Sequence, residues 1–85
     1  MKARIGVIGI VIEDRVKSAG KVNDILSNYG EIIIGRMGIP AREYGISVIS
    51  LIVKGSSDQI GAMTGQLGNL PGVSLKSALT KKEVE

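Results

Sequence analysis

The fold of this chain is decided by the stretch Ile46-Ser47-Val48-Ile49-Ser50-Leu51-Ile52-Val53. Successive side chains of a β-strand point to opposite faces of a sheet. The stretch therefore places Ile46, Val48 and Ile52 on one face, and Ile49, Leu51 and Val53 on the other. A strand that is apolar on both faces needs a cover on each side. A short chain with only two helical segments can hardly cover both faces. We therefore expect the second cover to come from another copy of the protein.

The composition predicts one small aliphatic domain. A chain of 85 residues buries only about 60% of its unfolded surface when it folds alone, and oligomerisation is a common remedy. Hydrophobic residues make up 44% of the sequence and aromatic residues 2%. There is no Cys and no His, which excludes thiolate and imidazole catalysis and zinc sites with nitrogen or sulfur ligands. We expect no cofactor, no metal and no catalytic residue.

The charge pattern argues against a membrane or nucleic-acid partner. The formal net charge is +3 and the basic residues are scattered, without the run of like charges that is typical of a nucleic-acid tail. Lys2 and Arg4 precede the apolar run 5–12, but Glu13-Asp14-Arg15 follows where a signal peptide has small neutral residues. The run is also too short to span a bilayer. We therefore expect a cytoplasmic protein.

Hydrophobic periodicity and capping residues divide the chain into six elements. Strands are predicted at 3–12, 31–39, 44–54 and 73–80, and helices at 15–29 and from Ser56 to Leu70. Asp14 is the predicted N-cap of the first helix and Gly30 its left-handed C-terminal stop. Ser56 and Gln59 form the capping box of the second helix. Residues 1–80 make a single domain, and residues 81–85 a frayed tail.

The order β-α-β-β-α-β predicts an α+β, ferredoxin-like sandwich with an antiparallel four-stranded sheet. Right-handed crossovers place both helices on the same face of that sheet. The first and third strands, which are both apolar on two faces, then lie in the middle. The sheet face opposite the helices is apolar and uncovered, and such a patch marks an interface or a ligand surface.

The predicted oligomer interface has two parts. The third strand contributes Ile46, Val48, Ile49, Leu51, Ile52 and Val53, since the sequence leaves open which of its faces the helices cover. The second helix contributes Gly61, Gly65 and Gly68, which fall on one outward side at 100° per residue. These glycines either admit the close approach of a neighbour or are simply tolerated in a weak helix. A dimer and a tetramer both remain open.

Two groups of polar residues are the candidate ligand site. Glu13, Asp14 and Arg15 stand where the first strand enters the first helix, whose free N–H groups can bind an anion. The alternative is that Asp14 caps the helix and the other two are solvated. Arg36, with Met37 and Gly38 beside it, offers a guanidinium suited to carboxylates and phosphates. The alternative is that Arg36 belongs to a solvated hairpin and binds no ligand.

The residues resemble an ACT-type domain in the turn Ile12-Glu13-Asp14-Arg15 and in the ending Leu70-Pro71-Gly72-Val73. The stretches 35–53, 61–68 and 73–80 resemble a small family named as regulators of the iron-only hydrogenase system. That family is similar to the ligand-sensing domain of the nickel-responsive repressor, whose nickel-binding His and Cys are absent here. ACT domains often bind an amino acid between subunits, through positions corresponding to 13–15 and 34–38.

The resemblance implies a regulatory domain rather than an enzyme. We expect a non-catalytic module, linked to the iron-only hydrogenase system, that self-associates and senses a small molecule such as an amino acid. One alternative is a protein-interaction or assembly module without a ligand. A remote alternative is an acyl-phosphate hydrolase, which shares this layout and binds phosphate with an Arg in the first loop. RNA-binding domains share the layout as well, but they stack bases on aromatic residues that this sheet lacks.

Overall fold

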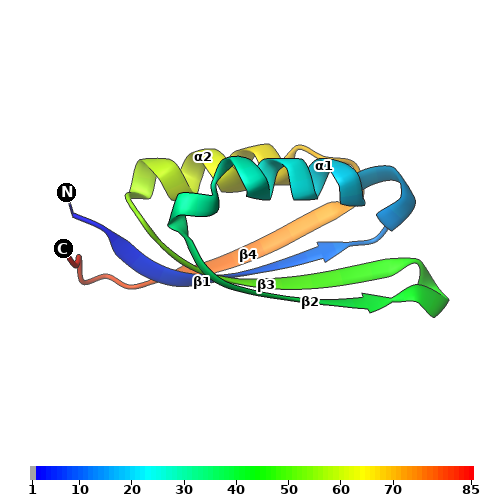
Figure 1. The fold of residues 1–85 in the computed structure, drawn as a ribbon, viewed down its shortest axis with the longest axis horizontal. Helices are drawn as coiled ribbons and strands as arrows, with labels where there is room; N and C mark the ends of the chain where they lie inside the picture. Colours follow the sequence, from blue (N-terminus) through cyan, green and yellow to red (C-terminus); the bar gives the residue numbers. More distant parts are fainter. Residues whose placement is uncertain (1) are drawn as a thin grey trace.

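The computed structural model describes residues 2–85 and has the predicted β-α-β-β-α-β order. The elements are β1 (Arg4–Ile12), α1 (Arg15–Asn28), the short 3-10 helix η1 (Gly30–Ile32), β2 (Ile33–Ala41), the 3-10 helix η2 (Arg42–Tyr44), β3 (Ile46–Gly55), α2 (Ser57–Gly68) and β4 (Val73–Leu79). The four strands form one antiparallel sheet in the order β2-β3-β1-β4. Both helices lie on the same face of this sheet (Figure 1). The prediction of a ferredoxin-like α+β fold is confirmed.

Side-chain caps set the starts of both helices, as the sequence predicts. Asp14 is the N-cap of α1 and its Oδ1 accepts a hydrogen bond from the Lys17 backbone N–H at 3.2 Å. Ser56 and Gln59 form a capping box at α2. The prediction for Gly30 is wrong, because only Gly45 and Gly72 have positive φ among the described residues. The chain instead continues from α1 into η1, and this delays the start of β2 to Ile33.

A β-bulge at Ile34 sets which side chains of β2 face the helices. Ile33 pairs with Val53 and Gly35 with Ile52, so Ile34 is the extra residue. Beyond the bulge, Arg36 pairs with Leu51 and Met37 with Ser50. A slip of one residue moves every following side chain to the opposite face. The bulge therefore turns Arg36 toward α1 and Met37 away from it.

The helices cover the face of β3 that carries Ile49, Leu51 and Val53. These three side chains are buried in the core, with exposed fractions of 6%, 0% and 0%. They pack with Ile8 and Ile10 of β1 and with apolar residues of both helices. The prediction that Ile49, Leu51 and Val53 belong to an oligomer interface is therefore wrong, since no partner can reach them in the folded chain.

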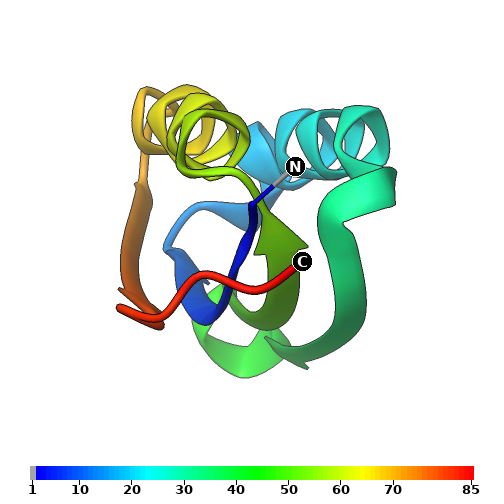
Figure 2. The ribbon, with the colours of Figure 1, turned by 90° about the vertical axis from the view of Figure 1, so that its left-hand side faces the viewer.

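The opposite side of the sheet, which we call the open face, is not covered by either helix (Figure 2). It carries apolar side chains. Its most exposed large side chains come from three strands: Val7, Met37, Ile39, Val48 and Ile52. Pairing across the sheet places them on one side, because directly opposite residues share a face. The apolar, uncovered face that the sequence predicts is thus present, and Val48 and Ile52 are the exposed large apolar residues that β3 contributes to it.

The two chain ends meet at the same end of the molecule (Figure 1). Ala3 and Val84 form a β-bridge in which each backbone N–H donates to the other residue's carbonyl oxygen at 2.7 Å. The Arg4 guanidinium also donates to the carbonyl oxygens of Thr80 and Lys81. Val84 lies in the segment 81–85 that the sequence predicts as a tail, and this bridge joins that segment to the start of β1. No helix within residues 2–85 is both long and apolar enough to cross a membrane.

Candidate functional site

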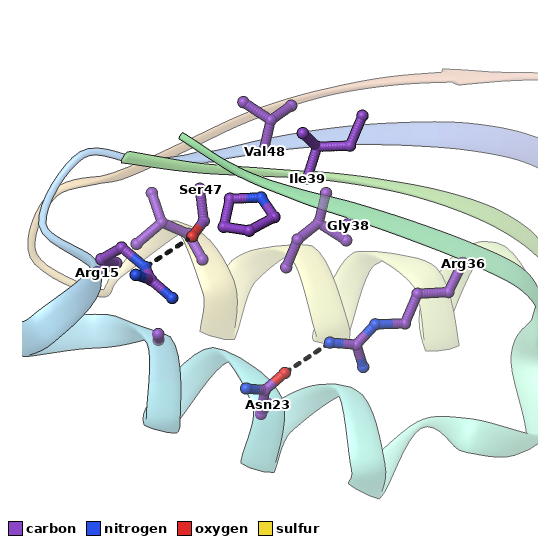
Figure 3. Close-up of a pocket in the computed structure, with 11 residues that line it drawn as sticks. Arg15, Asn23, Arg36, Gly38, Ile39, Ser47 and Val48 are labelled. Carbon is purple, nitrogen blue, oxygen red and sulfur yellow. Dashed lines mark hydrogen bonds between the residues drawn. The ribbon is translucent and has the colours of Figure 1, made fainter. Parts of the chain in front are cut away.

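A cleft of about 220 Å³ lies between α1 and the strands β2 and β3. Its polar lining consists of Arg15, Asn23, Arg36 and Ser47. Its apolar lining includes Ile12, Ala19, Pro40 and Ile49. Figure 3 shows Arg15 and Arg36 reaching from opposite ends into the space between α1 and the strands. We call this space the arginine cleft.

Arg15 is held at the first turn of α1. Its backbone N–H donates to the Gly45 carbonyl oxygen at 3.3 Å, which ties the β2–β3 hairpin to the start of the helix. Its Nε donates to Ser47 Oγ at 3.2 Å. A guanidinium carries five N–H donors in a planar fork, so the four donors on its two terminal nitrogens remain after the Ser47 contact. The fixed Nε aims them into the cleft.

Arg36 enters the cleft from the edge strand. The bulge at Ile34 places it on the helix-facing side of β2, and its Nη2 donates to Asn23 Oδ1 at 2.6 Å. Asn23 lies two turns of α1 after Arg15, with Ala19 midway between them, so one helical stripe lines the cleft. The hydrogen bond orients Arg36 across the cleft rather than into solvent (Figure 3).

The charge of the cleft is positive on both sides. Among the described residues that line it, two are arginines and none is acidic. Two guanidinium groups without a carboxylate partner repel each other, and an anion between them removes that repulsion. The arrangement can therefore bind a carboxylate or a phosphate-like group. Ser47 contributes its hydroxyl oxygen to the polar lining by accepting a hydrogen bond from Arg15.

The start of α1 offers fewer free N–H groups than the sequence suggests. The Glu13 N–H donates to the Gly72 carbonyl oxygen at 2.7 Å, the Arg15 N–H to Gly45, and the Lys17 N–H to Asp14. Gly72 has a φ of 71°, and its backbone lies close to that of Asp14. These contacts dock the Leu70–Val73 turn and the hairpin against the helix start. Within the first turn of α1, the N–H groups of Arg15 and Lys17 are therefore already engaged by the protein itself.

The structure brings together some of the predicted ligand residues and separates others. Arg15, Arg36 and Gly38 line the arginine cleft. Glu13, Asp14 and Met37 do not line it: Asp14 caps α1, and Met37 points to the open face. Sequence reasoning missed Asn23, Ser47, Ala19 and Pro40. The spacing 15, 19, 23 on one helical face was a usable signal for two of them, whereas Ser47 required knowledge of the hairpin's position.

The other predicted interface residues lie at the surface. On β3, Val48 and Ile52 are 45% and 42% exposed and Ile46 is half-buried. Gly61, Gly65 and Gly68 are exposed on α2, and a Cβ added at any of them would meet nothing within 4 Å. No packing within the described chain therefore requires glycine at these positions.

Residues 4–77 match the family described as "TM1266-like: Iron-only hydrogenase system regulator, putative". The structure is similar to that of the uncharacterized protein TM1266 from Thermotoga maritima, with 40% identity, 93% of this chain and 99% of that chain covered, and a TM-score of 0.88. It shares its fold with apo CPII, a nitrogen regulatory PII-like protein from Thiomonas intermedia K12, at 11% identity, 96% and 95% coverage and a TM-score of 0.58. No match to a curated protein was found. The chain belongs to the TM1266-like family of iron-only hydrogenase system regulators.

Proposed function

We propose that this chain is a non-catalytic regulatory domain that binds a small carboxylate in the arginine cleft and responds by a change in self-association. The family description supports a regulatory role. The observation that carries the ligand proposal is the pair Arg15 and Arg36, which face one cleft whose described lining contains no acidic side chain. A charged pair of this kind recognises anions through charge-assisted hydrogen bonds.

The volume and lining of the cleft narrow the ligand class. Sites for drug-sized ligands typically measure about 300–1,000 Å³, and the arginine cleft measures about 220 Å³. It suits a metabolite of a few carbon atoms better than a nucleotide. Ile12, Ala19, Pro40 and Ile49 favour a hydrocarbon segment between or beside the anionic groups. A short dicarboxylate satisfies both arginines, whereas the ammonium of an amino acid would find no carboxylate in this lining.

Calorimetric titration with a series of short acids tests the proposal. The series contains acetate, butyrate, malonate, succinate, glutarate, glutamate and inorganic phosphate. We expect a dicarboxylate to bind most tightly, and Arg36→Gln or Arg15→Gln to weaken it roughly tenfold or more, as for hydrogen bonds to charged groups. Arg42→Gln is the matched control, because Arg42 lies on η2 and does not line the cleft. Equal weakening by Arg42→Gln, or no binding across the series, would refute the ligand proposal.

The enzymatic alternative has its own assay. An acyl-phosphate hydrolase needs an attacking water and a phosphate site, and the cleft offers Arg15, Arg36 and Asn23 near one another. The Asn23 oxygen is engaged by Arg36, and neither His nor Cys is present in the chain. We therefore expect no hydrolysis of a small acyl phosphate above the background rate. Turnover that disappears in Arg15→Gln would favour the enzyme instead.

A second candidate function, assembly through the open face, is supported by a separate observation. Five large apolar side chains are exposed together there: Val7, Met37, Ile39, Val48 and Ile52. A patch of this kind marks an interaction surface. Sedimentation velocity tests it: Ile52→Lys should convert the assembly to monomer. Val16→Lys is the control, because Val16 is 97% exposed on α1 and lies off the open face. An assembly that survives Ile52→Lys would refute this candidate.

A further inference from the structure

We propose that the open face packs against the same face of a second copy, about a two-fold axis that runs along the strands between β1 and β3. Each chain would then insert a ridge on β2 into a hollow over β1 and β4 of its partner. The inference rests on the proposed self-association and adds its geometry. It follows from complementary shapes that lie on a single face of one chain.

The ridge consists of Met37 and Ile39, which are 64% and 62% exposed. The edge position of β2 leaves them without neighbours on their outer side. The hollow lies over β1 and β4 and is lined by Gly9, Val11, Ser74, Leu75 and Lys76, with a volume of about 330 Å³. Gly9 creates it, because a Cβ placed there would meet nothing within 4 Å. Both side chains of the ridge can enter a space of this size.

Ridge and hollow lie at the same height along the strands. Ser50 pairs with both Met37 and Gly9, and Gly9 pairs in turn with Lys76. The next row on this face runs through Ile39, Val48, Val11 and Ser74. A two-fold axis along the strands keeps this height and exchanges the two edges of the sheet. It therefore places Met37 over the partner's Lys76, beside Gly9 of the partner, and Ile39 over the partner's Ser74, beside Val11 of the partner.

The partner that packs on the open face is a second copy of this chain, because the ridge and the hollow lie on the same face of one chain. A two-fold interface uses the same patch on each subunit, which must be complementary to itself. The open face meets that condition, and its strand residues include only two charged side chains, Lys54 and Lys76, in keeping with the charge-poor centre of an interface. Lys76 lies on an edge strand, where its aliphatic stem can pack while the ammonium reaches water.

Size and sheet geometry are compatible with this pairing. A standard interface takes about 800 Å² from each partner, and one broad side of a molecule of 42 × 18 × 17 Å supplies an area of that order. Packed sheets prefer strand directions within about 30° of each other. A two-fold axis along the strands gives this aligned packing, with the sheets about 10 Å apart.

Thiol crosslinking of mixed subunits tests the geometry directly, because the natural chain has no Cys. Met37→Cys and Lys76→Cys are purified separately, mixed, allowed to exchange subunits and treated with a crosslinker that spans about 10 Å, one sheet-to-sheet distance. We expect covalent dimers in the mixture and none with either variant alone. An axis across the strands would put ridge on ridge, so that Met37→Cys alone would crosslink, and this result would overturn the proposal.

Filling the hollow tests the same contact without a crosslinker. Gly9→Leu has room in the isolated chain, so we expect a folded domain whose dimer dissociation constant is at least tenfold higher. Met37→Ala added to Gly9→Leu should recover part of the loss, since it empties the space that the leucine occupies. Gly61→Leu on the exposed side of α2 is the matched control and should leave the dimer unchanged.

The outcomes separate this geometry from self-association as such. A natural chain that sediments as a monomer at all concentrations refutes both. A stable oligomer that Ile52→Lys dissociates, but that Gly9→Leu leaves intact, keeps the open-face interface and refutes the ridge-and-hollow fit. An oligomer weakened by Gly61→Leu and not by Gly9→Leu assigns assembly to the α2 glycines instead.

Discussion

At the scale of single residues, two glycines of β1 have opposite structural roles. A Cβ at Gly6 would lie 2.5 Å from the Ala78 carbonyl oxygen and overlap the Leu79 side chain, so β4 could not approach β1 as closely. A Cβ at Gly9 would meet nothing. The same residue type therefore serves close strand packing at one position and leaves a surface hollow at the other.

Gly6→Ala is expected to destabilise the domain, whereas Gly9→Ala is not. Overpacking at Gly6 should lower the free energy of unfolding by about 1–3 kcal/mol. Gly9→Ala should be neutral or stabilising by up to about 1 kcal/mol, because alanine restricts the unfolded chain. Urea denaturation of both variants in the Ile52→Lys background measures this without a contribution from self-association. Similar losses at both glycines would contradict the assignment.

Ser18 ties the first helix to the turn before β4. Its side chain is fully buried and its Oγ donates to the Pro71 carbonyl oxygen at 2.6 Å. Ser18→Ala should lower the free energy of unfolding by about 1 kcal/mol, the usual value of one hydrogen bond. Ser27→Ala, at an exposed position of the same helix, controls for the change in helix propensity. Chemical denaturation that gives equal values for the two variants would contradict this role.

At the scale of elements, the decisive feature is the bulge at Ile34 in β2. It sends Arg36 to the arginine cleft and Met37 and Ile39 to the open face. If Ile34 were instead paired with β3 in an unbroken ladder, the alternation of side chains would exchange these positions. A single irregularity in an edge strand thus supplies one residue to the candidate ligand site and two to the proposed interface.

Deletion of Ile34 is expected to preserve both the fold and the binding of the dicarboxylate. Ile34 is 61% exposed, so its loss removes little core packing, and Gly35 and Arg36 can stay paired with Ile52 and Leu51 on the same faces as before. Circular dichroism reports the fold, and calorimetric titration with the best-binding acid of the series reports the site. Loss of affinity in a folded deletion variant would mean that the pairing of Arg36 with Leu51 is not sufficient to position Arg36.

At the scale of the whole molecule, the arginine cleft and the open face share the same two strands. Ile39 and Val48 contribute to the lining of the cleft, yet their side chains stand on the side of the strands away from α1 (Figure 3). A ligand that fixes β2 against α1 also fixes the ridge that the second copy would contact. This shared position gives the proposed regulator a physical route from binding to assembly.

The dicarboxylate is therefore expected to strengthen the dimer. Coupling between two sites typically changes an affinity about 5–150-fold, and it must act equally in both directions. Sedimentation with and without saturating ligand should show a lower dimer dissociation constant, and Arg36→Gln should remove this shift without dissociating the dimer. Reciprocally, Gly9→Leu, studied at a concentration at which it is monomeric, should bind the acid more weakly than the dimeric natural chain. A dimer dissociation constant that does not change with ligand would be compatible with both the cleft and the interface. It would exclude coupling between them.

Patterns local to the sequence were sufficient for the elements and their order. Capping residues such as Asp14 and Ser56 act on neighbouring N–H groups, so the helix starts follow from short spacings. The two-sided apolar pattern of the central strands fixed their place in the sheet and the existence of an uncovered face. The two arginines were identifiable because their chemistry depends on side-chain type.

The tertiary structure decided which face of each strand the helices cover and which side chains remain exposed. It buried Ile49, Leu51 and Val53, left Val48 and Ile52 exposed, and brought Arg15 and Arg36 into one cleft. These outcomes depend on the strand register, the bulge at Ile34 and the docking of the hairpin on α1. Such contacts join residues far apart in the chain, and alternating apolar residues constrain the spacing along a strand but not which side of it the helices cover.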